Sequence, residues 1–232
     1  MAGKLHKSVG RRMLGALLLV AMIGGGIGWW QLRHWQPSRA EFAKQGVEVG
    51  SDDGDVDWKA IKAVGADFAY IDASASAFAR DEKFSENFEN ASAARLKVGA
   101  VHRYDPCQPA DKQAANFVTV VPRDAKMLPP AVELVRLADD CPIKVRDAAV
   151  ESELMTFLNE IETHTGKPSI LKVGRAFEAK YHVAHRLDRN LWLMGDRVQP
   201  DYAGRPWSLW TANDALMTTG HDAALRWVVV QK

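Results

Sequence analysis

The sequence predicts an α/β protein, an irregular (β/α) barrel of the TIM-like kind that follows one N-terminal apolar helix. Short apolar segments alternate with segments of helical periodicity, a pattern typical of parallel sheets covered by helices. Eight candidate strands follow one another in a single stretch of chain, which favours closure into a barrel. The predicted domain, 46–232, is shorter than the about 250 residues typical of such barrels, so we expect loops in place of some helices.

Composition limits the classes of function. The chain has 232 residues, of which 30 are basic and 29 acidic, and 47% are hydrophobic. This is enough apolar material for one full core, and the balanced charge gives no reason to expect a nucleic-acid partner. Cys107 and Cys141 lack metal-type spacing, and we expect them to pair if the domain is exported. Nucleotide-binding loops and serine or cysteine nucleophile motifs are not found, so we predict no cofactor.

The N-terminus predicts export. A basic flank, 1–12, precedes a stretch without charge, 13–30, which closes on Trp29-Trp30. Its length reaches the low end of the about 17–25 residues that span a bilayer. We interpret it as an uncleaved, single-pass anchor in the inner membrane, with the flank in the cytoplasm and the domain facing the periplasm or exterior. The flank carries Lys4, Lys7, Arg11 and Arg12.

A cleaved signal peptide is the alternative for this segment, and the domain would then be secreted. Gly24-Gly25-Gly26 is a poor version of the small-residue site that signal peptidase needs. The following segment, 31–45, is polar with one proline, and we interpret it as a tether.

The elements of the domain can be placed in order. The first helix follows the turn-rich loop 51–55, is capped by Asp55 or Asp57, and places Trp58 and Ile61 on its inner face. The other expected helices are 83–96, 110–120 and 148–165. The expected strands are 46–50, 66–72, 98–101, 131–134, 169–173, 191–194, 207–211 and 225–230.

Three of these strands carry a carboxylate at the downstream end. Glu133 ends the segment Leu128-Pro129-Pro130-Ala131-Val132-Glu133, and Glu48 and Asp72 hold similar places on the first two strands. Chemistry in (β/α) barrels sits at the carboxyl ends of the strands, so Glu133 and Glu48 are the candidate catalytic residues. The alternatives are that Glu133 faces water and that Glu48 hydrogen-bonds barrel backbone.

Six segments of the domain carry a family resemblance: 46–49, 54–58, 67–71, 97–102, 128–130 and 165–168. Taken in order, they resemble glycoside hydrolase family 25, the lysozymes of the Chalaropsis type. These muramidases cut the β-1,4 link between N-acetylmuramic acid and N-acetylglucosamine in peptidoglycan, so the resemblance implies the peptidoglycan glycan strand as substrate. Tyr104-Asp105-Pro106-Cys107 together with Cys141 resembles a proteobacterial branch of the family, which implies a disulfide beside the active-site face.

The resemblance also implies that the usual catalytic residues have changed. The family ends its strand after Pro-Pro with Asp-x-Glu, and that Glu is the general acid; this sequence has Glu133-Leu134-Val135. The Asp of the family's first strand is Glu48, and the Asp-Leu-Asn motif near the C-terminus is best matched by Ala224-Leu225-Arg226. Valine cannot donate a proton, and losing a general acid typically forfeits about 10²–10⁴ in rate.

Two functions follow as hypotheses. In the first, the domain is a muramidase with altered carboxylates, in which Glu133 acts with Glu48 or Asp72, or Asp139 or Asp140 swings in. In the second, it is an inactive module that binds glycan strands or a protein partner. Trp192, Trp207 and Trp210 are either core residues or sugar-stacking platforms, and His102 either lines the site or is structural. The expected substrate-binding residues are Asp72, His102, Tyr104 and Trp210.

Overall fold

The computed structural model describes residues 2–219 and 221–232, with side chains from Met13 onward except that of residue 222. It divides into two compact units, one ending at Trp35 and one covering Gln36–Lys232. The first is the helix α1 (Ala2–Arg33), of which Met13–Arg33 is long and apolar enough to cross a membrane, with a mean hydropathy of 1.8. This agrees with the predicted apolar helix. The basic side chains of the predicted flank 1–12 lie outside the described residues.

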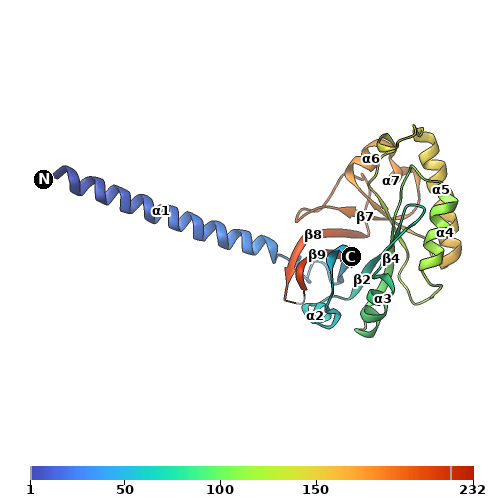
Figure 1. Cartoon of the computed structure of the whole chain (residues 1–232), viewed down its shortest axis with the longest axis horizontal. Coiled ribbons are helices and arrows are strands. Elements are labelled where there is room, and N and C mark those ends of the chain that lie inside the picture. The colour runs from blue at the N-terminus through green and yellow to red at the C-terminus, as the bar shows by residue number, and fades with distance from the viewer. Residues whose placement is uncertain (1, 220) are drawn as a thin grey trace. The chain divides into compact units, whose positions relative to one another are not determined.

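The second unit is a closed eight-stranded barrel (Figure 1), which confirms the predicted fold class. Hydrogen bonds join the strands in the order β1-β9-β8-β7-β6-β5-β4-β2, and β1 pairs with β2 to close the ring. The short strand β3 (Ala79–Arg80) folds back on β2 as a hairpin. The barrel strands are β1 (Gln45–Val49), β2 (Phe68–Ala75), β4 (Lys97–Arg103), β5 (Ala131–Leu134), β6 (Ile170–Val173), β7 (Asn190–Met194), β8 (Leu209–Thr218) and β9 (His221–Val230).

One feature of the sheet differs from the prediction. The alternating pattern implied an all-parallel sheet, but β9 runs antiparallel to both of its neighbours, β8 and β1. β8 ends at Thr218 and β9 begins at His221, and a connection this short cannot provide the crossover that parallel strands need. The barrel is therefore closed by a hairpin.

The helices are fewer than the strands, as the domain length predicted. Asp57 caps α2 (Trp58–Val64) by accepting hydrogen bonds from the backbone N–H of Lys59 and Ala60, both 3.0 Å. A loop, 195–208, joins β7 to β8. The remaining helices are α3 (Phe84–Ala93), α4 (Ala110–Val120), α5 (Asp147–Thr165), α6 (Arg175–Tyr181) and α7 (Val183–Arg186), with the short 3₁₀ turns Ser51–Asp53 and Ala138–Asp140.

An apolar layer fills the middle of the barrel. Trp192 is fully buried there, and its indole N–H donates to the Thr211 hydroxyl at 2.9 Å. Side chains alternate between the two faces of a strand, so the next inward position lies two residues further on. On several strands that next position is charged, which places a charged layer above the apolar one. The apolar layer consists of Phe68, Tyr70, Val101, Ala131, Ile170, Trp192, Leu209 and Val228.

Candidate functional site

The charged layer lies inside the carboxyl end of the barrel. Each of its members stands two residues from a member of the apolar layer, except Glu48, which is paired in register with Tyr70 of β2 and Arg226 of β9. The alternation of strand side chains therefore brings together groups that are far apart in the sequence. Its members are Glu48, Asp72, Arg103, Glu133, Lys172 and Arg226.

Lys172 occupies the centre of this layer. Its Nζ lies 2.5 Å from Glu48 Oε1 and 2.5 Å from Glu133 Oε2, and its side chain is 2% exposed. The ammonium also lies 5.1 Å from the centroid of the Trp192 ring. Burial alone would lower the pKa of the lysine, but the two carboxylates outweigh burial and raise it. Lys172 is therefore a fixed positive charge between the two candidate catalytic residues.

Glu133 is held in its ionised form. Burial alone would raise its pKa, but the charges of Lys172, Arg103 and Arg226, with the hydrogen bond from Lys172, outweigh burial and lower it. A general acid of a glycosidase needs the opposite, a pKa raised towards neutrality. In this arrangement Glu133 is poorly suited to proton donation.

Asp72 is the carboxyl group with the raised pKa. Burial first, and the nearby charge of Glu48 second, raise it to about 7 against the opposing effect of Arg103 and Arg226. Arg103 donates to Asp72 Oδ2, while Arg226 Nη2 lies 3.7 Å from the same oxygen and 2.9 Å from Asp53 Oδ2. Asp72 Oδ1 is buried without a hydrogen-bond partner among the described residues.

Val135 stands at the position that the resemblance assigned to the general acid. It follows β5 directly and is 45% exposed. Asp139, which was considered as a substitute acid, instead has its Oδ2 2.5 Å from Lys180 Nζ, outside the charged layer. Asp140 is exposed in the same 3₁₀ turn. The site therefore has a surface-exposed apolar side chain at the position where the resemblance places the general acid.

Three predicted substrate-binding residues lie away from the charged layer. His102 is fully buried outside the barrel wall, bonded to the Ser74 hydroxyl (2.8 Å) and the Gln113 side-chain oxygen (3.3 Å), with its ring 4.6 Å from that of Phe157 on α5. Burial lowers its pKa to about 4, so it is neutral at physiological pH. Tyr104 is 3% exposed and packs on the same Phe157 ring.

Trp210 is likewise a packing residue. It is 2% exposed, with ring centroids 5.8 Å from Phe42 and 6.0 Å from Trp207. It neighbours Leu209 of the apolar layer, so the alternation of β8 turns it to the opposite face. We therefore propose that His102, Tyr104 and Trp210 serve packing rather than ligand contact. Asp72 alone of the expected binding residues belongs to the charged layer.

Sequence reasoning missed the cations of the site. Lys172 interrupts the apolar strand Ile170–Val173, and Arg226 lies within β9, two residues before Val228 of the apolar layer. A charge inside an otherwise apolar strand is a usable signal, because such groups are rarely fully buried unless paired. The sequence predicts no metal site. In the described part of the chain, no group of three or more His, Cys, Asp or Glu is placed to hold a metal ion.

A disulfide and an ion pair tie together two loops at the carboxyl end of the barrel. Cys107 and Cys141 are bonded, which confirms their predicted pairing, with an S–S distance of 2.08 Å and Cα atoms 5.3 Å apart. Arg136 Nη1 lies 2.8 Å from Asp105 Oδ2 between the same loops. The loops that follow β4 and β5 are thus fixed beside Val135.

Comparison with known proteins identifies the family. The model of "Glycosyl hydrolases family 25" matches residues 47–221. The chain belongs to glycosyl hydrolase family 25. Its fold resembles the family 25 glycosyl hydrolase from Bacillus anthracis, with a TM-score of 0.76 and 26% identity over 85% of this chain and 92% of that one. It also resembles the bacterial lysozyme of Streptomyces coelicolor, with a TM-score of 0.72 and 19% identity over 81% and 91% of the two chains.

Two curated relatives match at lower coverage. Lysozyme M1 of Streptomyces globisporus is 33% identical over 73 residues, which is 32% of this chain and 25% of that protein. The uncharacterised protein YegX of Escherichia coli O6:H1 is 24% identical over 184 residues, 75% of this chain and 65% of YegX. The matched regions thus span a quarter to just under two thirds of these relatives' length.

Proposed function

We propose that this family 25 domain is held outside the cytoplasm by an uncleaved N-terminal anchor and binds the peptidoglycan glycan strand without cutting it. The observation that carries the proposal is the pairing of buried Lys172 with both Glu48 and Glu133. Glycoside hydrolysis requires one carboxyl group that can donate a proton and a second that is free to attack or to stabilise the developing positive charge. Here the Lys172 ammonium forms ion pairs with both candidate carboxylates, Glu48 and Glu133.

The lack of a suitable acid at Glu133 and Val135 supports the same proposal. Val135 cannot donate a proton, and the charges around Glu133 lower its pKa. Replacing either partner of a buried ion pair is costly, so the arrangement is unlike a poised catalytic pair, in which one group must change its charge during the reaction. The charged layer is better suited to holding the carboxyl end of the barrel rigid than to transferring protons.

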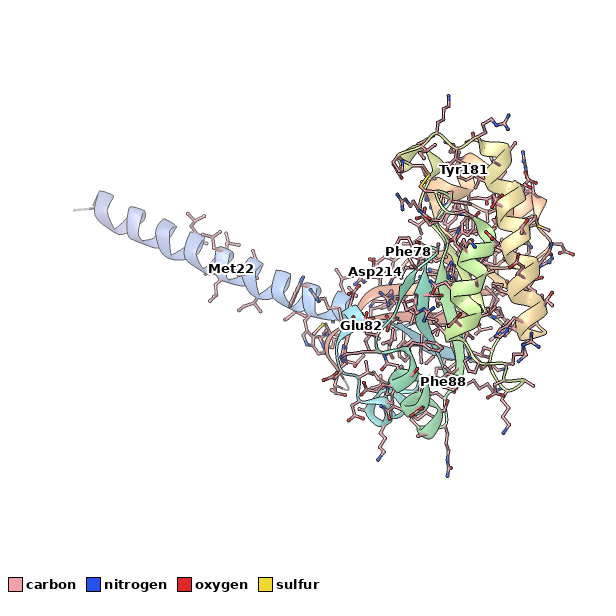
Figure 2. The ribbon with its side chains drawn as sticks, turned by 45° about the vertical axis from the view of Figure 1, so that its right-hand side comes forward. Met22, Phe78, Glu82, Phe88, Tyr181 and Asp214 are labelled. Atoms are coloured by element: carbon pink, nitrogen blue, oxygen red, sulfur yellow. A yellow bond between two sulfur atoms is a disulfide. The ribbon has the colours of Figure 1, made fainter. Side chains whose placement is uncertain are left out.

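The surface at the carboxyl end offers apolar contacts for a ligand. Among the described side chains of the barrel unit, the large exposed hydrophobics all lie in segments that follow barrel strands: Phe78 after β2, Val135 and Ile143 after β5, and Val198 after β7. Phe78 is 75% exposed at the turn between β2 and β3 (Figure 2). An exposed aromatic ring at a sugar-binding face can stack on a pyranose ring, and Phe78 is our candidate for that contact.

One observation favours a second function, residual muramidase activity. Asp72 has a pKa raised to about 7 and a buried oxygen, Oδ1, without a partner among the described groups. A carboxyl group that is protonated near neutrality can act as a general acid. Asp72 is only 5% exposed, so this function requires the carboxyl end of the barrel to open before the glycosidic oxygen can reach the carboxyl group.

Co-sedimentation with peptidoglycan tests the proposal. The unit Gln36–Lys232, which has its own closed core, is incubated with purified peptidoglycan, and the pellet and the released fragments are measured by blotting and mass spectrometry. We expect the protein in the pellet and no fragments with reducing muramic acid ends. Phe78→Ala is expected to weaken binding several-fold. Phe88→Ala, which removes a partly buried ring on the α3 helix, is the control for loss of an aromatic ring elsewhere. Absence from the pellet contradicts binding.

A further inference from the structure

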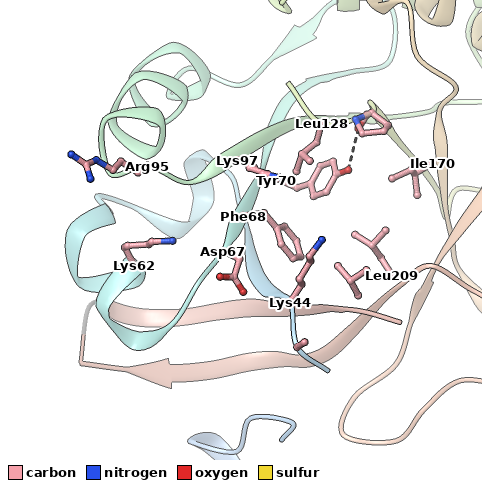
Figure 3. A pocket seen from close by; sticks show the side chains of 13 residues that line it. Lys44, Lys62, Asp67, Phe68, Tyr70, Arg95, Lys97, Leu128, Ile170 and Leu209 are labelled. Carbon is pink, nitrogen blue, oxygen red and sulfur yellow. Dashed lines mark hydrogen bonds between the residues drawn. The ribbon is translucent and has the colours of Figure 1, made fainter. Parts of the chain in front are cut away.

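A cavity lies at the amino end of the barrel, opposite the charged layer. It has a volume of about 530 Å³, within the range of about 300–1,000 Å³ typical of ligand sites. Its wall comes from the starts of several strands and the end of β9, as Figure 3 shows for most of its residues. The apolar wall consists of Phe68, Tyr70, Leu128, Pro129, Ile170, Leu209 and Val230.

The wall of the cavity offers no free hydrogen-bonding group, because its one hydroxyl is already bonded. The Tyr70 hydroxyl donates to the Pro129 carbonyl at 3.1 Å, which is the dashed contact in Figure 3. Phe68, Ile170 and Leu209 each belong to the apolar layer of the barrel and extend it to this opening. A ligand entering the cavity therefore meets hydrocarbon rather than hydrogen-bonding groups.

The rim of the cavity is cationic. It carries Lys44, Lys62, Arg95 and Lys97, and none of these four side chains has an ion pair or a hydrogen bond within the part of the chain that the structure describes. The single carboxylate of the lining, Asp67, is already engaged, since Arg39 Nη1 lies 3.1 Å from its Oδ2 and the Gln45 N–H donates to it. The rim thus has uncompensated positive charge around an apolar interior.

We propose that this cavity binds an anionic membrane phospholipid, with acyl chain carbon against the apolar wall and the phosphate between the rim cations. Apolar burial combined with attraction to negative headgroups is how proteins bind anionic membrane surfaces. The inference rests on the retained anchor of the proposed function, but it does not depend on glycan binding.

The chain itself brings lipid within reach of this end of the barrel. The segment 34–44 joins the end of α1 to the start of β1, and it spans about 40 Å at most when fully extended. Lys44, the last residue of that segment, is itself part of the rim. A membrane that holds α1 therefore supplies phospholipid at high local concentration to the cavity.

Photo-crosslinking in vesicles tests this site. The full chain is reconstituted in phosphatidylcholine vesicles with or without phosphatidylglycerol, each lipid in turn carrying a photoreactive group on its acyl chain. Crosslinked residues are then mapped by mass spectrometry. We expect phosphatidylglycerol to label the cavity wall, at Phe68, Leu128 or Leu209, several-fold more than phosphatidylcholine does. Equal labelling by the two lipids, or labelling confined to α1, overturns the proposal.

Variants separate the cavity from general charge effects. Lys44→Glu/Lys97→Glu is expected to reduce the labelling several-fold, and Lys59→Glu/Lys112→Glu, at the starts of α2 and α4, is the charge-matched control expected to leave it unchanged. Leu128→Trp fills the cavity from a partly exposed position and is expected to abolish the labelling without changing the melting temperature. Equal loss in the control, or displacement by inorganic phosphate alone, overturns the assignment to a phospholipid. Peptidoglycan co-sedimentation of the same variants stays unchanged if the two sites are separate.

Discussion

Lys172 on β6 donates a hydrogen bond across the barrel to Glu48 on β1, with 2.5 Å between Nζ and Oε1. The two side chains are almost completely buried, so the pair is shielded from solvent. The same lysine holds Glu133 on β5. A single buried cation therefore links three strands of the barrel and neutralises the carboxylates that the position in the fold would otherwise offer for catalysis.

Removing this cation is expected to destabilise the domain strongly. Lys172→Met keeps the length of the side chain but leaves Glu48 and Glu133 buried without their partner, so we expect the free energy of unfolding to fall by about 3–5 kcal/mol. Urea denaturation of the unit Gln36–Lys232 measures it. Lys180→Met, which breaks a pair with the exposed Asp139, is the control and is expected to change stability little. Equal midpoints for the two variants would show that Lys172 does not hold the barrel.

The raised pKa of Asp72 leads us to expect that stability depends on pH. Its pKa is raised from 3.8 to about 7, so the folded state keeps a proton that the unfolded chain has released over this range. The stabilising contribution is therefore complete below about pH 4 and is lost as the pH rises through about 7. Compared with Asp72→Asn, which does not titrate, the natural protein is expected to lose stability over that interval. Parallel stability curves from pH 4 to 8 would contradict the raised pKa.

The sequence predicts where the strands lie better than which face of a strand each side chain occupies. All eight barrel strands are predicted, because each contains a short apolar run between turns. β8 and β9 extend well beyond the predicted 207–211 and 225–230, and the short strand β3 is not predicted. The direction of β9 is not predicted, since periodicity carries no information on direction. Glu48, Asp72 and Glu133 are predicted from their places at strand ends. The sequence does not reveal which face His102 and Trp210 occupy, because a shift of one residue turns a side chain to the other face.

The cations of the charged layer show a second limit of sequence reasoning. Lys172 reaches Glu48 only after the barrel closes, because β6 and β1 lie on opposite sides of the ring. Arg103 and Arg226 meet Asp72 and Glu48 on neighbouring strands, but only once those strands have paired. The pattern of one strand cannot reveal which charge on another strand lies opposite. The family resemblance indicated that catalytic positions had changed, but the neutralising role of Lys172 follows only from the structure.

His102 is expected to remain neutral over the physiological range. Burial lowers its pKa from 6.5 to about 4, so its imidazole does not gain a proton between pH 8 and 5. Proton NMR of histidine resonances, assigned with a His102→Gln variant, measures this. The exposed His185 is the internal comparison. A midpoint of His102 near 6.5 would mean that water reaches the layer between the barrel and α5.

The disulfide is expected to contribute substantially to stability. Cys107 and Cys141 are 34 residues apart, and closing a loop of this length restricts the unfolded chain by about 3–4 kcal/mol. Cys107→Ser/Cys141→Ser is expected to lower the midpoint of urea unfolding, and reducing the natural protein should lower it by a similar amount. If reduction leaves the midpoint unchanged, the two loops are held by other contacts such as that of Arg136 with Asp105.

The most direct test of the account is release of muramic acid reducing ends from purified peptidoglycan by the natural sequence, measured beside Glu133→Gln, Asp72→Asn and an active family 25 lysozyme. We expect the natural sequence to sediment with the peptidoglycan and to release no fragments above the level of a no-enzyme sample, because Lys172 neutralises both Glu48 and Glu133 and Val135 cannot act as the acid. Release of such fragments by the natural sequence, lost in Glu133→Gln or Asp72→Asn, would contradict the account and establish a working muramidase.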